Sequence, residues 1–100
     1  MKIDFAALEW ETSASGLRSK TLERDGKRVR LLEHSRAVRE EDWCEKPHVG
    51  YVVEGELEIN FSGKTEAFRA GEGIFIAAGE KHKARSLTEK TLLFLVEEIP

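Results

Sequence analysis

The side chains best suited to chemistry in this chain are one cysteine and three histidines. They are Cys44, His34, His48 and His82. A lone cysteine excludes a disulfide within the chain. The thiol precedes Lys46 and His48, two neighbours that would favour its reactive thiolate form. Thiolate and imidazole are also ligands for zinc and related metals. The residue types therefore raise two kinds of chemistry, thiol-based sensing and metal binding.

Composition limits the classes of protein to which the chain could belong. Its 100 residues suffice for one domain. Lys plus Arg number 16 and Asp plus Glu number 19, which gives a net charge of −3 and makes the chain a poor candidate for a dedicated nucleic-acid binder. No apolar run reaches the roughly 20 residues of a membrane span, and the N-terminal stretch is too acidic for a signal peptide. With a single thiol, we expect a cytoplasmic protein with no nucleic-acid or membrane partner.

Short segments separated by turn residues predict an all-β domain over residues 17–100. The Asp25-Gly26 pair predicts a hairpin between strands at 18–24 and 27–33. Further strands are expected at 48–53, 56–61, 65–69, 74–76 and 92–96. About eight short strands at this spacing indicate a sandwich or small barrel. Residues 1–16 are expected to form an arm or a short helix that begins near Asp4.

Alternation along the strands predicts which side chains are buried. Position 48 shares a strand face with Gly50 and Val52, opposite Val49 and Tyr51. Tyr51, with Trp43 and Phe75, is expected in the core or along a pocket. Glycines recur every eight residues at predicted turns, at Gly55, Gly63, Gly71 and Gly79. The expected core comprises Leu57, Ile59, Phe61, Ile74, Ile76, Leu93 and Leu95.

Two segments resemble the conserved motifs of the cupin family. GEGIFIAAGEKHKARS, at residues 71–86, is similar in spacing to the second cupin motif and matches it at Gly71, Gly79 and His82. YVVEGELEI, at 51–59, resembles the end of the first motif, with Gly55 as its last glycine. Together the motifs cover nearly half of the chain. The resemblance implies a single-domain, double-stranded β-helix (cupin jelly-roll barrel) like the small bacterial cupins of unassigned function.

The resemblance also implies a set of metal ligands that departs from the usual three histidines and one glutamate. The family's glutamate position is His48 here, and its first two histidine positions are Asp42 and Cys44. With His82, these residues form a set suited to tetrahedral Zn²⁺, while an open site would also suit Fe, Ni or Mn.

Each candidate also has a structural interpretation. His82 lies among charged neighbours, as a surface histidine would, and His48 could be a hydrogen-bonded residue of the rim. Cys44 could be a small buried apolar side chain, and Asp42 a solvated member of an acidic run. His34 matches no motif position and is expected to be structural or exposed.

Basic residues alternate across the predicted first hairpin. They are Arg18, Lys20, Arg28 and Arg30. They fit a solvated, ion-paired strand face. Alternatively, one or two could reach the barrel mouth and hold an anionic ligand, since Arg matches carboxylate geometry.

The favoured function is a small-molecule-binding cupin with a divalent-metal site at the barrel mouth. The family carries out oxidation, isomerisation and lyase reactions, so the resemblance leaves the reaction, and whether there is one, open. The alternatives are a metal-free ligand-binding or sensing module and a thiol-based sensor at Cys44. Exposed strand edges leave backbone groups unpaired, and the small cupins that the chain resembles form dimers. We therefore expect a homodimer.

Overall fold

The computed structural model describes residues 1–99, which form nine β-strands and one turn of 3₁₀-helix, η1 (Phe5–Ala7). The strands are β1 (Glu11–Ala14), β2 (Leu17–Arg24), β3 (Lys27–Ser35), β4 (His48–Glu54), β5 (Glu56–Asn60), β6 (Thr65–Arg69), β7 (Gly73–Ile76), β8 (Lys83–Ser86) and β9 (Lys90–Glu98).

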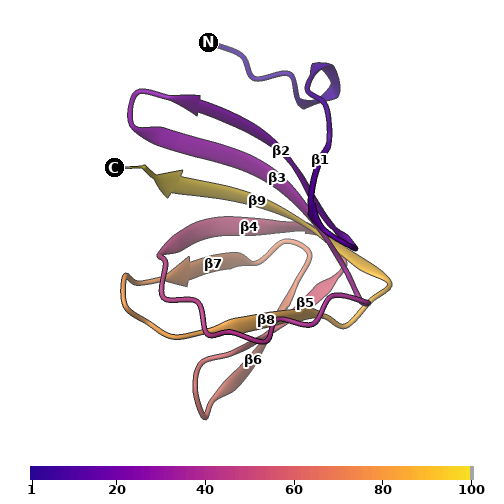
Figure 1. Cartoon of the computed structure of the whole chain (residues 1–100), viewed down its shortest axis with the longest axis vertical. Helices are drawn as coiled ribbons and strands as arrows, with labels where there is room; N and C mark the ends of the chain where they lie inside the picture. The colour runs from indigo at the N-terminus through magenta and orange to yellow at the C-terminus, as the bar shows by residue number, and fades with distance from the viewer. Residues whose placement is uncertain (100) are drawn as a thin grey trace.

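The strands form two antiparallel sheets of unequal size. The larger sheet has the order β1-β2-β3-β9-β4-β7 and the smaller has the order β6-β5-β8. Figure 1 shows the two sheets coming together at one end of the molecule and spreading apart at the other. This arrangement confirms the expected all-β, double-stranded β-helix (jelly-roll) fold.

The strands of the predicted first hairpin pair in the register that the turn sequence requires. Arg24 is opposite Lys27, so two residues form the turn. Both have positive φ, 53° at Asp25 and 72° at Gly26. Such a turn matches the twist of the flanking strands.

The core lies between the sheets and contains the alternating apolar residues of both. Its buried members are Val52, Leu57, Ile59, Ile74, Ile76, Leu93 and Leu95. Six of the seven expected core residues are therefore buried, whereas Phe61 is only partly buried at the margin. Phe61 follows the last residue of β5, so it has fewer strand neighbours to cover it.

Polar contacts close the narrow end of the sandwich. Ser86 Oγ and Thr91 Oγ1 lie 2.7 Å apart and are both buried. Thr91 also donates to the Glu56 carbonyl at 2.9 Å, which links β9 to β5. Gly55 is needed beside this contact, because it has φ +86° and a Cβ there would lie 2.5 Å from the Lys90 carbonyl oxygen.

The connection between β3 and β4, residues 36–47, lies against β8 and covers the space between the sheets. Cys44 and His82 exchange backbone hydrogen bonds of 2.9 Å in both directions. Gly79 N–H donates to the Glu45 carbonyl at 2.9 Å, and the Glu40 carboxylate accepts from Ala84 N–H. These bonds hold a segment without regular strand structure in a fixed position.

The N-terminal segment, expected to form an arm or a short helix that begins near Asp4, contains a single helical turn. Asp4 caps only the single turn η1, by accepting from Ala6 N–H at 3.1 Å. Residues 11–14 then pair with β2 as strand β1. So short a segment cannot sustain a helix by itself. Contacts with the sheet order it instead, since Arg18 and Lys20 lie over the Trp10 ring.

The outer face of β4 and β7 carries exposed apolar side chains. Val49, Tyr51 and Val53 are 45–48% exposed, and Phe75 is 77% exposed. The expectation that Tyr51 and Phe75 lie in the core or a pocket is therefore wrong. Both strands contribute to the core, but these two residues are on their outward-facing positions.

Candidate metal centre

Three residues from separate segments meet at the wide end of the sandwich. His48 begins β4, His82 immediately precedes β8, and Cys44 lies in the connection at residues 36–47. Backbone pairing between Cys44 and His82 brings these two side chains together, and β4 supplies His48 from the larger sheet.

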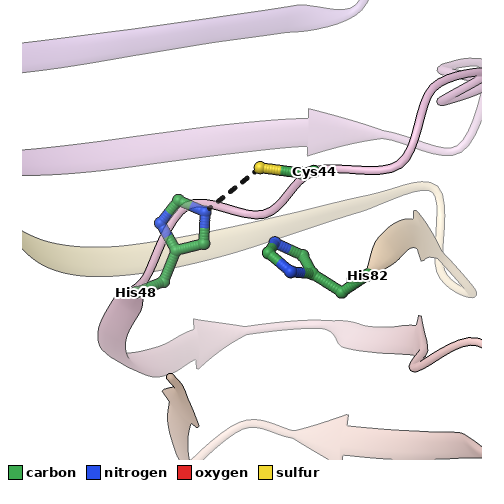
Figure 2. Close-up of side chains that lie close together, drawn as sticks. All are labelled: Cys44, His48 and His82. Carbon is green, nitrogen blue, oxygen red and sulfur yellow. Dashed lines mark hydrogen bonds between the residues drawn. The ribbon is translucent and has the colours of Figure 1, made fainter. Parts of the chain in front are cut away.

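The ligand atoms of these three residues converge. They all lie within 4.8 Å of one another, close enough to form a metal site. Cys44 Sγ is 3.9 Å from His48 Nε2, and the two imidazole centroids are 5.2 Å apart with rings at 84°. Figure 2 shows the three side chains directed toward a common point. Around tetrahedral zinc, ligand atoms lie about 3.3–3.8 Å apart, so a small inward movement would complete the site.

Neighbouring groups orient both imidazoles so that Nε2 is available. His82 Nδ1 is 2.9 Å from the Glu80 carbonyl oxygen, which can only accept a hydrogen bond. His48 Nδ1 is 2.7 Å from Glu97 Oε2. A proton on each Nδ1 leaves the lone pair on each Nε2. Metal-binding histidines characteristically make such contacts with carbonyl or carboxylate groups.

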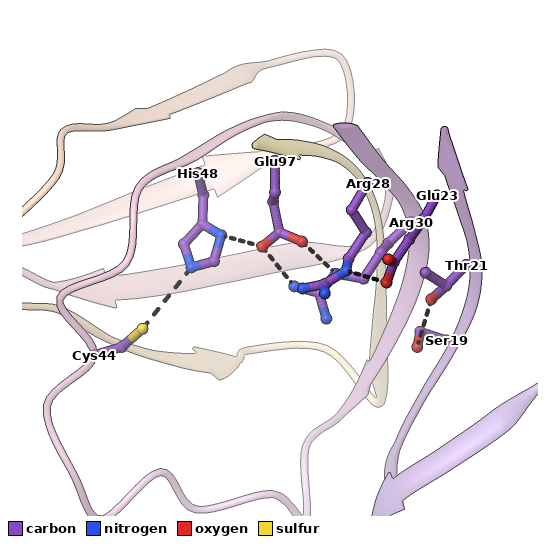
Figure 3. A network of polar contacts seen from close by, with 8 residues as sticks. All are labelled: Ser19, Thr21, Glu23, Arg28, Arg30, Cys44, His48 and Glu97. Carbon is purple, nitrogen blue, oxygen red and sulfur yellow. Dashed lines mark hydrogen bonds and ion pairs between the residues drawn. The ribbon is translucent and has the colours of Figure 1, made fainter. Parts of the chain in front are cut away.

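Glu97 connects His48 to Arg30. The Arg30 guanidinium lies 2.8–2.9 Å from the two carboxylate oxygens, and the Glu97 side chain is only 9% exposed. Burial alone would raise the pKa of Glu97, but contacts with His48 and Arg30 outweigh it and lower the pKa to about 2. Glu97 is therefore a carboxylate at neutral pH. Figure 3 shows the resulting chain of contacts from Cys44 through His48 and Glu97 to β3.

A family comparison agrees with this fold, and the matched region contains the three residues. The model of the cupin domain matches residues 38–96. The chain belongs to the cupin family. No curated protein matches it.

Solved structures similar to this cupin extend over most of its length. One is a protein of unknown function from Rhizobium leguminosarum, with 21% identity and a TM-score of 0.82. The alignment covers 100% of the present chain and 97% of the Rhizobium chain. An RmlC-like cupin from Shewanella frigidimarina covers 95% and 86%, with 23% identity and a TM-score of 0.79. KdgF from Halomonas sp. covers 88% and 83%, with 21% identity and a TM-score of 0.75. At these identities the comparisons show the shared fold.

The candidate metal centre of this cupin opens into a cavity of about 290 Å³. Apolar side chains of both sheets line its middle, including Leu32, Leu93 and Leu95. Three basic residues and two acidic ones also line it: Arg28, Arg30, Lys46, Glu40 and Glu97. A volume of this size suits a small organic molecule.

Two of the four ligands that the resemblance implies, Asp42 and Cys44, lie in the connection at residues 36–47. Cys44 joins the cluster, whereas Asp42 is exposed and is not one of the three residues whose ligand atoms converge. The segment is not a strand at Asp42. Motif spacing therefore did not place this carboxylate among the converging side chains.

One residue of the cavity was missed in the sequence, and for another the structure decides between two alternatives. Glu97 is the first charged residue after the apolar run of β9, in phase with inward-facing Leu93 and Leu95, so period-two alternation could have identified it. His34 was expected to be structural or exposed; it is 2% exposed and lines the cavity.

Of the basic residues in the first hairpin, Arg28 and Arg30 line the cavity. Arg18 instead pairs with Glu33 at 3.0 Å, and Lys20 donates to the Phe5 carbonyl at 2.8 Å. Over residues 1–99, no helix is long and apolar enough to cross a membrane.

Proposed function

We propose that this cupin binds a divalent metal through Cys44 Sγ, His48 Nε2 and His82 Nε2, and that a small molecule binds beside the metal in the cavity. The convergence of these three ligand atoms within 4.8 Å carries the proposal. Three protein ligands leave a coordination position for water or a ligand. A metal held in this way would supply a Lewis acid beside the cavity, at the wide end of the sandwich.

The donor set favours zinc over the other candidate metals. A thiolate with two imidazoles suits Zn²⁺, and also accommodates Fe²⁺ or Ni²⁺, whereas Mn²⁺ prefers oxygen ligands. The orientation of His48 by Glu97 and of His82 by the Glu80 carbonyl supports the same interpretation, because fixed Nδ1 contacts increase the availability of Nε2.

Element analysis and zinc titration test the proposal. The protein is purified without chelator, its metal content is measured, and the metal-free protein is titrated with Zn²⁺ against a chromophoric chelator. We expect one zinc per chain, loss of tight binding in His82→Ala and weaker binding in Cys44→Ser. Asp42→Asn serves as the matched control from the same segment and should bind like the wild type. Absence of Zn²⁺, Fe²⁺ and Ni²⁺ binding by the folded wild type would leave the metal-free binding module as the better description.

A second candidate function is thiol-based sensing at Cys44. It is favoured by the position of Cys44, whose Sγ lies 3.9 Å from His48 Nε2 and whose side chain lines the cavity. The two functions differ in a simple measurement. In metal-free protein, iodoacetamide should alkylate Cys44 rapidly whichever function is correct. Added zinc should slow this alkylation only if Cys44 is a metal ligand.

A further inference from the structure

His34 is a buried imidazole with one nitrogen that the protein does not use. It lies on the inner face of β3 and lines the cavity. Its Nδ1 is 3.2 Å from the Ser35 carbonyl oxygen, so Nδ1 carries the proton. Its Nε2 is fully buried and has no hydrogen-bond partner within residues 1–99. Buried polar atoms are normally paired, which makes this nitrogen a candidate contact for a ligand.

The charge state of His34 determines what it can accept. Burial lowers the pKa of His34, and the Glu40 carboxylate opposes this effect only in part. The ring is therefore neutral at pH 7, and Nε2 presents a lone pair. Glu40 also lines the cavity. This part of the cavity thus offers two acceptors and calls for a ligand group that donates a hydrogen bond.

The opposite part of the cavity has the complementary character. Arg28, Arg30 and Lys46 line the cavity. Glu97 pairs with the Arg30 guanidinium and links Arg30 to His48 of the candidate metal centre, and Glu23 pairs with Arg28 at 3.1 Å. Lys46, which lies between Cys44 and His48 in the sequence, makes no ion pair within residues 1–99. Arg30, Leu32 and His34 follow one another on the inner face of β3, and at about 3.3 Å per residue His34 lies roughly 13 Å from Arg30. A ligand that spans this distance would pass the apolar side chains of Leu93 and Leu95.

We infer that the cavity binds a small carboxylic acid whose carboxylate lies between Lys46 and the metal and whose terminal hydroxyl donates to His34 Nε2. The inference rests on the proposed function, since it places the carboxylate beside the metal. A carboxylate suits both a lysine ammonium and a divalent metal. Leu32 and its apolar neighbours accommodate the methylene chain between the two ends.

Matched pairs of straight-chain acids test this assignment. Zinc-loaded protein is titrated calorimetrically with acids from butanoate to octanoate and with the same acids carrying a terminal hydroxyl. At the length that spans the cavity, the hydroxy acid should bind the wild type roughly three- to tenfold more tightly than the plain acid. His34→Phe, which keeps the ring and removes the acceptor, should abolish this preference. His34→Gln, whose amide oxygen can accept, should retain part of it, and both variants should bind zinc like the wild type.

The outcomes separate this inference from the function on which it rests. Equal binding of plain and hydroxylated acids by the wild type would overturn the role of His34 and leave the metal-bound carboxylate intact. A preference that survives in His34→Phe would overturn it as well. If zinc binds but no acid does, the carboxylate assignment fails while the metal site stands. If zinc itself does not bind, the proposed function fails first.

Discussion

His48 Nδ1 lies 2.7 Å from Glu97 Oε2, so a buried carboxylate orients the imidazole that the larger sheet contributes to the candidate metal centre. Glu97 is in turn held by both Arg30 contacts. The position of His48 therefore depends on three adjacent strands, β3, β9 and β4. A ligand fixed in this way loses little conformational freedom when a metal binds.

Glu97→Gln should weaken zinc binding about 10- to 100-fold, the usual cost of removing the partner of a metal-binding histidine. The amide keeps the shape of the side chain but removes the charge that favours a proton on His48 Nδ1. Competition with a chromophoric chelator measures the change. Glu98→Gln, on the adjacent exposed position, is the matched control and should leave the zinc affinity unchanged. Equal affinities for both variants would contradict a positioning role for Glu97.

The same carboxylate predicts a loss of stability in acid. The pKa of Glu97 is lowered from 4.5 to about 2 in the folded protein. The unfolded chain therefore binds a proton first as the pH falls, so stability is complete above about pH 4.5 and is lost progressively toward pH 2. The contribution is at most about 3 kcal/mol. Urea unfolding of the metal-free protein between about pH 4.5 and pH 2 measures this effect. The free energy of unfolding should depend more steeply on pH in the wild type than in Glu97→Gln. Parallel curves would contradict the assignment.

Leu57→Ala should lower the free energy of unfolding by about 2–5 kcal/mol, because Leu57 is 1% exposed and its truncation would leave a cavity in the core. Glu58→Ala removes the neighbouring outward side chain and its 2.8 Å ion pair with Arg85. Such partly exposed pairs contribute about 0–1 kcal/mol. Chemical denaturation of the two variants compares them directly. Similar losses would show that the register of β5 is wrong.

The exposed apolar residues on β4 and β7 support the expectation of a homodimer. β7 is an edge strand, and Phe75 on it is 77% exposed, close to the partly exposed Val49 that pairs with it. Edge strands with apolar faces tend to pair with another chain. Light scattering should give a mass of two 11.3-kDa chains, and Phe75→Lys should shift it toward one. Thr65→Lys, on exposed β6, is the control. A wild-type mass of one chain at micromolar concentration would contradict the prediction.

Local patterns were sufficient to predict most strands, because alternation in β5 and the Asp25-Gly26 turn depend on nearby residues alone. The convergence of Cys44 and His82 could be anticipated only through motif spacing, since their segments are far apart in the sequence and meet by backbone pairing. Strand β8 and the short β1 were missed because neither has a run of apolar residues. The unused nitrogen of His34 follows from the packing of the whole barrel, so no local pattern indicates it.

The two ends of the sandwich are joined by different chemistry. At the narrow end, Ser86, Thr91 and Glu56 connect the strands through hydrogen bonds that the chain itself supplies. At the wide end, a metal bound to His48 of the larger sheet and to His82 beside the smaller one would act as a removable cross-link. Metal supply would then set the stiffness of the mouth, since a ligand that binds only the folded state stabilises it according to its free concentration. The barrel would open and exchange its contents more readily when metal is scarce than when it is abundant.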